Sequence, residues 1–329
     1  MTIIGIISDF GARGSHYVAE MKGVAFQINP DVQIIDITHN ITPFSIREAA
    51  YVLRTVYDTF PKGTIFVTVV DPGVGSNRDI LAIQTIDDYI FIGPNNGIFS
   101  YLQAHNLIAV ALKIEEEEFF YPPFTEMIKE RRKHRESLQE IENEVNVPDA
   151  INIDFLKKND SIQGSVSSLE TDLWAGTFHG RDIMMPIACH LASGLEIFSV
   201  GSVCDEISII PDLIPSFSED ERFILTKIQY CDSFGNLITN IPIGLFLSKL
   251  QQTAPFVHLH YKGKEHQLKI SKIFAGNDEN QLLFIEGSSG FMEIALNKGS
   301  AQVYLDAKVE DDLKIELLGG LFSEFTPQL

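Results

Sequence analysis

The sequence predicts a two-domain protein, with an N-terminal α/β domain whose central sheet is largely parallel and a C-terminal domain of mostly antiparallel β-strands. Three observations predict this fold class. The chain has 329 residues, about twice the usual size of one domain. Its first hundred residues alternate β-branched apolar runs with helical stretches, which is typical of a parallel sheet. Beyond residue 217, short alternating segments favour a small antiparallel sheet or barrel.

The N-terminal strands are predicted from five apolar runs, which lie at 3–8, 32–38, 63–71, 80–86 and 89–94. Between the first two runs, residues 17–28 carry an apolar face at helical spacing and end before Pro30. Ser45 and Glu48 resemble a capping box, which predicts a helix over 46–58. The loops that follow the strands therefore gather at one edge of the sheet, where open α/β sheets bind ligands.

The composition changes between about residues 115 and 170, where acidic and basic clusters predict a charged, solvent-exposed helical insertion. Order resumes at 173–182, followed by an apolar helix from 183 to about 192 with Gly194 as its C-cap. The proline-containing segment 209–220 reads as a linker. We therefore expect an N-terminal domain over 1–210 and a C-terminal domain over 217–329.

The C-terminal domain is predicted from eight short alternating segments, with no helical stretch longer than about ten residues. They are 223–232, 237–242, 256–263, 266–274, 282–287, 291–296, 301–305 and 313–318.

The composition narrows the class of protein. No apolar run approaches the roughly 20 residues that span a bilayer, and the N-terminal Ile run resembles a buried strand rather than a signal peptide, so we expect a cytoplasmic protein without membrane contacts. A formal charge of −20 would repel nucleic acid. Cys189, Cys204 and Cys231 lack CxxC or Cys/His spacing and are expected to be core thiols, not metal ligands.

Three loops carry candidate chemistry. Asp9 at a strand end could hold a ribose diol, although such residues more often cap turns. Asp71 and Arg78 share a Gly-rich loop that lacks the P-loop signature; they could orient a water molecule or form a structural pair. His179 lies beside glycine at a loop-to-helix junction, which makes it a better site candidate than most lone histidines, although such residues are usually structural. No GxSxG elbow is present.

Longer strings resemble one known family, the S-adenosyl-L-methionine (SAM) hydroxide adenosyltransferases, which are adenosine-forming SAM hydrolases related to fluorinating and chlorinating enzymes. The matching strings run in family order and are SDFG (8–11), YVAEMKGV (17–24), DITHNITPFSIREAAYVL (36–53), FPKGTIFVTVVDPGVGSNR (60–78), IGPNNGIFS (92–100), TFHGRDIMMP (177–186), DSFGNLITNI (232–241) and GSSGFMEIALNKGSA (287–301). The N-terminal loop SDFGARGSHYV departs from the family form: it is one residue longer and lacks a second Asp. The 115–170 segment is longer than the family's.

The resemblance implies an N-terminal α/β domain, a C-terminal β-barrel and a homotrimer with active sites between subunits. It assigns catalysis to a triad, Asp71, Arg78 and His179. It also implies a set of substrate-binding residues, with no cofactor and no metal. These are Asp9 for the ribose hydroxyls, Phe44 against the nucleoside, Asn95 and Phe178 nearby, Asp232 and Asn236 for the methionine ammonium, Ser288 and Ser289 near its carboxylate, and Phe234, Asn297 and Lys298 around adenine.

The implied reaction is displacement at ribose C5′ by water or hydroxide, with neutral methionine leaving. Two alternatives remain open. A halogenase would need to admit a halide, which a carboxylate at 71 should repel; halogenases similar to this chain carry hydroxyl-bearing side chains in place of Asp71 and Val74. A non-catalytic trimer that binds adenosine or SAM could use Asp9, Phe44, Asp232 and Asn236, but has no need of the triad.

Overall fold

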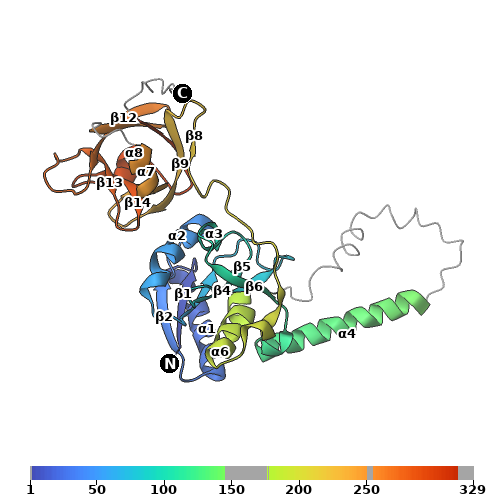
Figure 1. Cartoon of the computed structure of the whole chain (residues 1–329). Helices are drawn as coiled ribbons and strands as arrows, with labels where there is room; N and C mark the ends of the chain where they lie inside the picture. The colour runs from blue at the N-terminus through green and yellow to red at the C-terminus, as the bar shows by residue number, and fades with distance from the viewer. Residues whose placement is uncertain (1, 145–175, 177, 250–254, 318–329) are drawn as a thin grey trace, which may run out of the picture. The chain divides into compact units, whose positions relative to one another are not determined.

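The computed structural model describes residues 2–144, 176, 178–249 and 255–317 of the chain (Figure 1). The chain divides into two compact units, the first formed by residues 1–49 and 57–208 and the second by residues 50–56 and 209–329. The division at residue 209 falls in the proline-containing segment. Of the predicted insertion at 115–170, residues 145–170 lie outside the described part of the chain.

The first unit has a central sheet with the strand order β2-β1-β3-β5-β4-β6-β7 among its described residues. Four neighbouring strands are parallel: β2 (Gln33–Thr38), β1 (Ile3–Ser8), β3 (Ile65–Val69) and β5 (Ile90–Pro94). Three more are antiparallel to their neighbours: β4 (Ile80–Thr85), β6 (Ile108–Ile114) and β7 (Gly201–Val203). The prediction of a largely parallel sheet is confirmed, while β6 and β7 were not predicted.

The helices of the first unit supply its core and its loops. They are α1 (Ser15–Ile28), α2 (Ile46–Val56), α3 (Ser100–Ala104), α4 (Pro122–Glu144), a π-helix (Gly180–Met184) and α6 (Met185–Ala192), with single 3-10 turns at Ala12–Gly14, Tyr57–Thr59, Glu117–Phe119 and Ile197–Val200. Met21 of α1 and Ile187 of α6 are fully buried with β1 and β3 in one core. This burial explains why these parallel strands consist of apolar residues.

Two local predictions are refined. Ser45 Oγ accepts a hydrogen bond from Glu48 N (3.4 Å), but Glu48 Oε2 accepts from Thr42 N (3.2 Å) instead of completing the capping box. The charged insertion begins as the predicted helix: Phe124 and Ile128 of α4 are buried, and Figure 1 shows α4 extending away from the sheet of the first unit.

The second unit is a closed β-barrel. Its seven strands in the described residues follow the order β10-β14-β13-β12-β11-β15-β9, and β9 also pairs with β10. All pairs are antiparallel except β12 with β13. The strand bounds are β9 (Phe223–Cys231), β10 (Leu237–Pro242), β11 (Phe256–Tyr261), β12 (Lys264–Ser271), β13 (Leu282–Glu286), β14 (Phe291–Leu296) and β15 (Asp312–Glu316), and β8 (Ser216–Phe217) adds to β9. The predicted barrel is confirmed.

Two short helices accompany the barrel, α7 (Ile243–Lys249) and α8 (Ala301–Leu305). The interpretation of 301–305 as a β-type segment was therefore wrong. Ser300 caps α8, because its Oγ accepts a hydrogen bond from Val303 N (3.1 Å), and local capping outweighs the alternating pattern.

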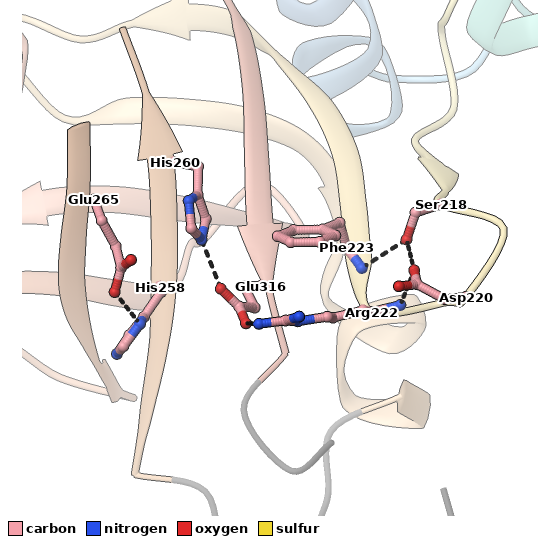
Figure 2. Close-up of polar contacts among 8 residues, drawn as sticks. All are labelled: Ser218, Asp220, Arg222, Phe223, His258, His260, Glu265 and Glu316. Carbon is pink, nitrogen blue, oxygen red and sulfur yellow. Dashed lines mark hydrogen bonds and ion pairs between the residues drawn. The ribbon is translucent and has the colours of Figure 1, made fainter. Parts of the chain in front are cut away.

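Hydrogen bonds and ion pairs link side chains of neighbouring strands on one wall of the barrel, as Figure 2 shows. Glu316 of β15 accepts from Arg222 Nε (2.7 Å), and its other oxygen meets His260 Nε2 (2.6 Å). His258 Nδ1 lies 2.6 Å from Glu265 on β12. Within the described residues, no helix is long and apolar enough to cross a membrane, and Cys189, Cys204 and Cys231 are free thiols.

Candidate active site

A pocket of about 260 Å³ opens at the predicted ligand edge of the sheet in the first unit. Its walls come from the loops after β1, β2 and β3 and from the start of the π-helix. The lining residues are Asp9, Phe10, Pro43, Phe44, Val69, Asp71, Val74, Phe178, His179, Gly180 and Met184. The structure thus brings together five of the residues predicted from the sequence, namely Asp9, Phe44, Asp71, Phe178 and His179.

Asp71 follows β3, and only one of its two carboxylate oxygens, Oδ1, is hydrogen-bonded within the described residues. Its Oδ1 accepts a hydrogen bond from Gly73 N (3.1 Å) and a charge-assisted one from Arg78 Nη1. The carboxylate side chain is only 7% exposed, whereas that of Arg78 is 25% exposed. Oδ2 has no hydrogen-bond partner in the part of the chain that the structure describes, so this oxygen is available to a water molecule in the pocket. Arg78 itself does not line the pocket, but its guanidinium group forms an ion pair with Asp71, which does.

His179 stands at the N-cap of the π-helix and is 5% exposed. A π-helical turn inside a helix is a local irregularity that often accompanies functional sites. The next residue, Gly180, has little room for a side chain, because a Cβ there would lie 3.0 Å from Val69 Cγ1. This close approach sets His179 beside the end of β3. The His179 ring also lies edge-on to Phe124, with ring centroids 6.4 Å apart.

Asp9 is tied to the segment that carries Phe44. Asp9 Oδ2 accepts a hydrogen bond from Phe44 N (2.8 Å), and Phe44 adopts a φ of 70°, a left-handed conformation that is unusual for an aromatic residue. The Phe44 side chain is 69% exposed. The pocket edge thus carries an exposed aromatic ring on a strained backbone, a surface on which a flat aromatic ligand can stack.

Aromatic rings form another side of the pocket. Phe10, Tyr17 and Phe178 pack on one another with centroid distances of 5.2 to 5.8 Å. The sequence prediction had named Phe178 but not Phe10, Pro43, Val69, Val74, Gly180 or Met184, which also line the pocket. Phe10 and Val74 lie in the quoted loop motifs, and Met184 follows Gly180 at helical spacing, so proximity to the motifs was the available signal.

Asn95 lies outside this pocket. Its Nδ2 donates to Glu206 O (3.0 Å), and its Oδ1 accepts from Ser208 N (2.8 Å). Both ends of the amide therefore bind one backbone segment, residues 206–208, and a substrate contact by Asn95 stays a prediction.

In the second unit, Asp232 organises the predicted DSFGN loop. Its Oδ1 accepts from the backbone N of Phe234 (2.9 Å) and Asn236 (2.8 Å), and its Oδ2 accepts from Asn236 Nδ2 (2.8 Å). Phe234 is 78% exposed at the tip of this loop. Glu293 lies opposite on β14, where burial, with a further contribution from Asp232, raises its pKa to about 7.

The remaining predicted residues occupy two turns of the second unit. Ser288 and Ser289 lie between β13 and β14. Asn297 is buried, and its amide donates to the backbone oxygens of Asn277 (2.8 Å) and Asp278 (3.1 Å), while Lys298 pairs with Glu279. The structure thus brings five of the predicted residues together in the pocket of the first unit, while the predicted residues of the second unit lie on separate loops and turns. Among the described residues, no group of three or more His, Cys, Asp or Glu side chains is arranged to hold a metal ion.

Comparisons with known proteins agree with this architecture. The chain is 28% identical over 320 residues to an (R)-S-adenosyl-L-methionine hydrolase from Methanocaldococcus jannaschii, covering 96% of each protein. It is 28% identical to a fluorinase from an Actinoplanes species, over 73% of this chain and 71% of that one. A crystal structure of an uncharacterized conserved protein from Thermotoga maritima is similar with a TM-score of 0.71 and 31% identity, covering 95% of this chain and 99% of that one.

Both units match the domains of one family. Residues 4–142 match the SAM hydroxide adenosyltransferase N-terminal domain, and residues 226–314 match the corresponding C-terminal domain. The chain therefore belongs to the SAM hydroxide adenosyltransferase family.

Proposed function

We propose that the protein hydrolyses S-adenosyl-L-methionine to adenosine and L-methionine, with Asp71, Arg78 and His179 as its catalytic group. The observation that carries the proposal is the pocket of the first unit. It combines a carboxylate bound by arginine, a buried histidine, a second carboxylate and exposed aromatic rings. Binding alone would not require the first two groups beside each other.

The chemistry needs a nucleophile more than an acid. The C5′–S bond breaks and its electron pair goes to sulfur, so the sulfonium becomes the neutral thioether of methionine and needs no proton. A water oxygen forms the new bond to C5′, and its proton passes to Asp71 Oδ2 and then to solvent. Arg78 holds Asp71 in place, and His179 stabilises the developing hydroxide. Asp9 accepts from the ribose hydroxyls, and Phe44 lies against the nucleoside.

The methionine half of the substrate is assigned to the second unit. Asp232 and Asn236 would hold its ammonium, Ser288 and Ser289 its carboxylate, and Phe234, Asn297 and Lys298 would border adenine. None of these second-unit residues lines the pocket of the first unit, so they would have to reach the substrate from another surface. We propose that this surface belongs to a neighbouring subunit of a homotrimer.

The carboxylate of Asp71 favours water over a halide as the nucleophile. The Asp71 side chain is only 7% exposed. Because a carboxylate shielded from water interacts more strongly with other charges, it repels a halide more than it would in bulk water. A cytoplasmic location, and the absence of nucleic-acid and membrane partners, remain part of the proposal as predictions from the sequence.

The test is to identify the nucleoside that purified protein forms from SAM, with and without chloride or fluoride. Because the hydrolase relative is named for the (R) epimer, the (R) and (S) sulfonium epimers are assayed separately. Adenosine in equal amounts with and without halide supports hydrolysis. A 5′-halogenated nucleoside would show a halogenase, and binding without any product would show a non-catalytic SAM-binding protein.

A further inference from the structure

A chain of polar side chains runs beneath the ribose side of the pocket. Ser8 Oγ lies 2.8 Å from His39 Nδ1, and His39 Nε2 lies 3.1 Å from Asp36 Oδ1. Asp36 Oδ2 accepts from Lys22 Nζ of α1 (2.6 Å). Ser8 is fully buried at the end of β1, so this Ser-His-Asp series cannot present a nucleophile to a substrate.

The Asp36 carboxylate is the ionised end of this series of side chains. Burial alone would raise the pKa of Asp36, but contacts with Lys22 and His39 hold this pKa below its usual range. His39 Nε2 makes no hydrogen bond within the described residues, so Ser8 is the hydrogen-bond partner of the ring and Asp36 is a close polar neighbour of its other nitrogen. Together these two contacts limit the orientation of the ring.

His39 holds the backbone on both sides of Asp9. Its ring contacts Ser8, the residue before Asp9, and its carbonyl oxygen accepts from Gly11 N (2.6 Å), two residues after Asp9. Gly11 has φ 63° and ψ −175°, a conformation that is open essentially to glycine alone, so the loop turns sharply at this point.

The strand that leads to His39 is itself irregular. The register between β1 and β2 shifts between Ile6 and Ile7, whose partners are Asp36 and Thr38. Such bulges re-aim the side chains that follow them and often accompany functional sites. The bulge lies directly before the loop that carries His39, which supports a role in setting its position.

Asp9 is thus fixed with one oxygen free. Oδ2 accepts from Phe44 N, while Oδ1 has no hydrogen-bond partner in the described ranges of the chain. We propose that His39 is a positioning residue for Asp9: through Ser8 and Gly11 it aims the carboxylate at the 2′,3′-diol of the nucleoside. This inference rests on the proposed function, because it takes adenosine as the ligand of the pocket.

The experiment compares the dissociation constants of adenosine and 2′,3′-dideoxyadenosine by calorimetry. His39→Ala removes the ring contact with Ser8 but keeps the backbone hydrogen bond to Gly11. It should weaken adenosine binding about tenfold, the effect of misaligning one hydrogen bond between Asp9 and the diol, and change dideoxyadenosine binding less than about twofold. His39→Asn, whose shorter amide reaches about as far as Nδ1, should restore much of the preference for adenosine. A merely structural role would weaken both ligands equally, and that result would overturn the proposal.

Two further variants complete the test. Asp9→Ala should abolish the preference for adenosine, and adding His39→Ala to it should cause no further loss, because His39 acts through Asp9. Additive losses would overturn the proposal. His105→Ala, at an exposed histidine after α3, is the control and should bind both nucleosides as the wild type does.

The wild-type assay distinguishes a failure of the proposed hydrolysis from a failure of the proposed role of His39. If the wild type prefers adenosine but produces none from SAM, the proposed hydrolysis fails while the role of His39 stands. If the wild type hydrolyses SAM and His39→Ala keeps the full preference for adenosine, only the role of His39 fails.

Discussion

The guanidinium group of Arg78 occupies the space that a side chain at Gly73 would need. A Cβ built on Gly73 would lie 1.7 Å from Arg78 Nη2. The absence of a side chain at residue 73 therefore permits the ion pair between Arg78 and Asp71.

Gly73→Ala should displace Arg78 and lower kcat for SAM hydrolysis by about 10- to 100-fold, a loss typical of a disturbed acid–base group. The midpoint of thermal unfolding should change little, because the loop is partly exposed. Gly23→Ala is the control: a Cβ there meets nothing within 4 Å, and kcat should be unchanged. Wild-type kcat in Gly73→Ala would show that the position of Arg78 does not matter to turnover.

Mixed oligomers should reveal whether the site is shared between subunits. Asp71→Ala and Asp232→Ala should each be inactive alone. If a site uses the first unit of one subunit and the second unit of its neighbour, random 1:1 mixing restores about a quarter of the wild-type activity. Light scattering should give the mass of a trimer for each sample. Trimers that recover no activity on mixing would place both residues of each site on a single chain.

Glu316 should stabilise the barrel above acidic pH. Burial alone would raise its pKa, but Arg222 and His260 hold that pKa below its usual 4.5 (Figure 2). A lowered pKa in the folded state means that the stabilisation is present above pH 4.5 and is lost as the pH falls through the folded-state pKa. Glu316→Gln should cost about 1–3 kcal/mol of the free energy of unfolding at pH 7 and flatten its decline in acid.

The matched control for Glu316 is Glu265→Gln on the same wall. Glu265 pairs with His258 but is 54% exposed, so its removal should cost under about 1 kcal/mol. Urea unfolding of both variants between pH 3 and 7 makes the comparison. Equal losses in the two variants would mean that the Arg222 and His260 contacts add nothing.

Glu293 should have the opposite pH dependence. Burial and the nearby Asp232 raise its pKa to about 7. A raised carboxyl pKa means that stability is full below the usual value of 4.5 and declines as the pH rises toward 7. Glu293→Gln should remove this decline and raise the free energy of unfolding at pH 8 by on the order of 2 kcal/mol. Glu286→Gln on the adjacent strand is the control, and a Glu293→Gln profile that matches the wild type would contradict the assignment.

The sheet edge could be predicted because strand period and loop composition are local properties. Asp9, Asp71 and His179 each follow or precede a strongly patterned element, and parallel strands bring their ends to one edge. The sequence pattern alone does not decide whether Asp71 and Arg78 form a structural ion pair or a catalytic one. The resemblance to one family favours the catalytic pair, and the geometry adds that Arg78 pairs with Asp71 without lining the pocket itself.

Other features depend on contacts distant in sequence, which local patterns do not encode. The amide of Asn95 is occupied by residues 206 and 208, more than a hundred positions away. The Ser8–His39 contact spans 31 positions. Both residues lie in strings quoted from the sequence, but neither string predicts that the two side chains meet. Residues 301–305 form a helix because Ser300 caps it, a preference that the alternating pattern obscured.

In the proposed mechanism, Asp71 activates water for attack at C5′. Reaction of SAM in water enriched in oxygen-18, followed by mass spectrometry of the nucleoside, tests it directly. The account predicts adenosine labelled in its 5′-hydroxyl for the wild type, and binding of adenosine without turnover for Asp71→Ala and His179→Ala. Unlabelled adenosine, a different nucleoside product, or wild-type rates in either variant would contradict it.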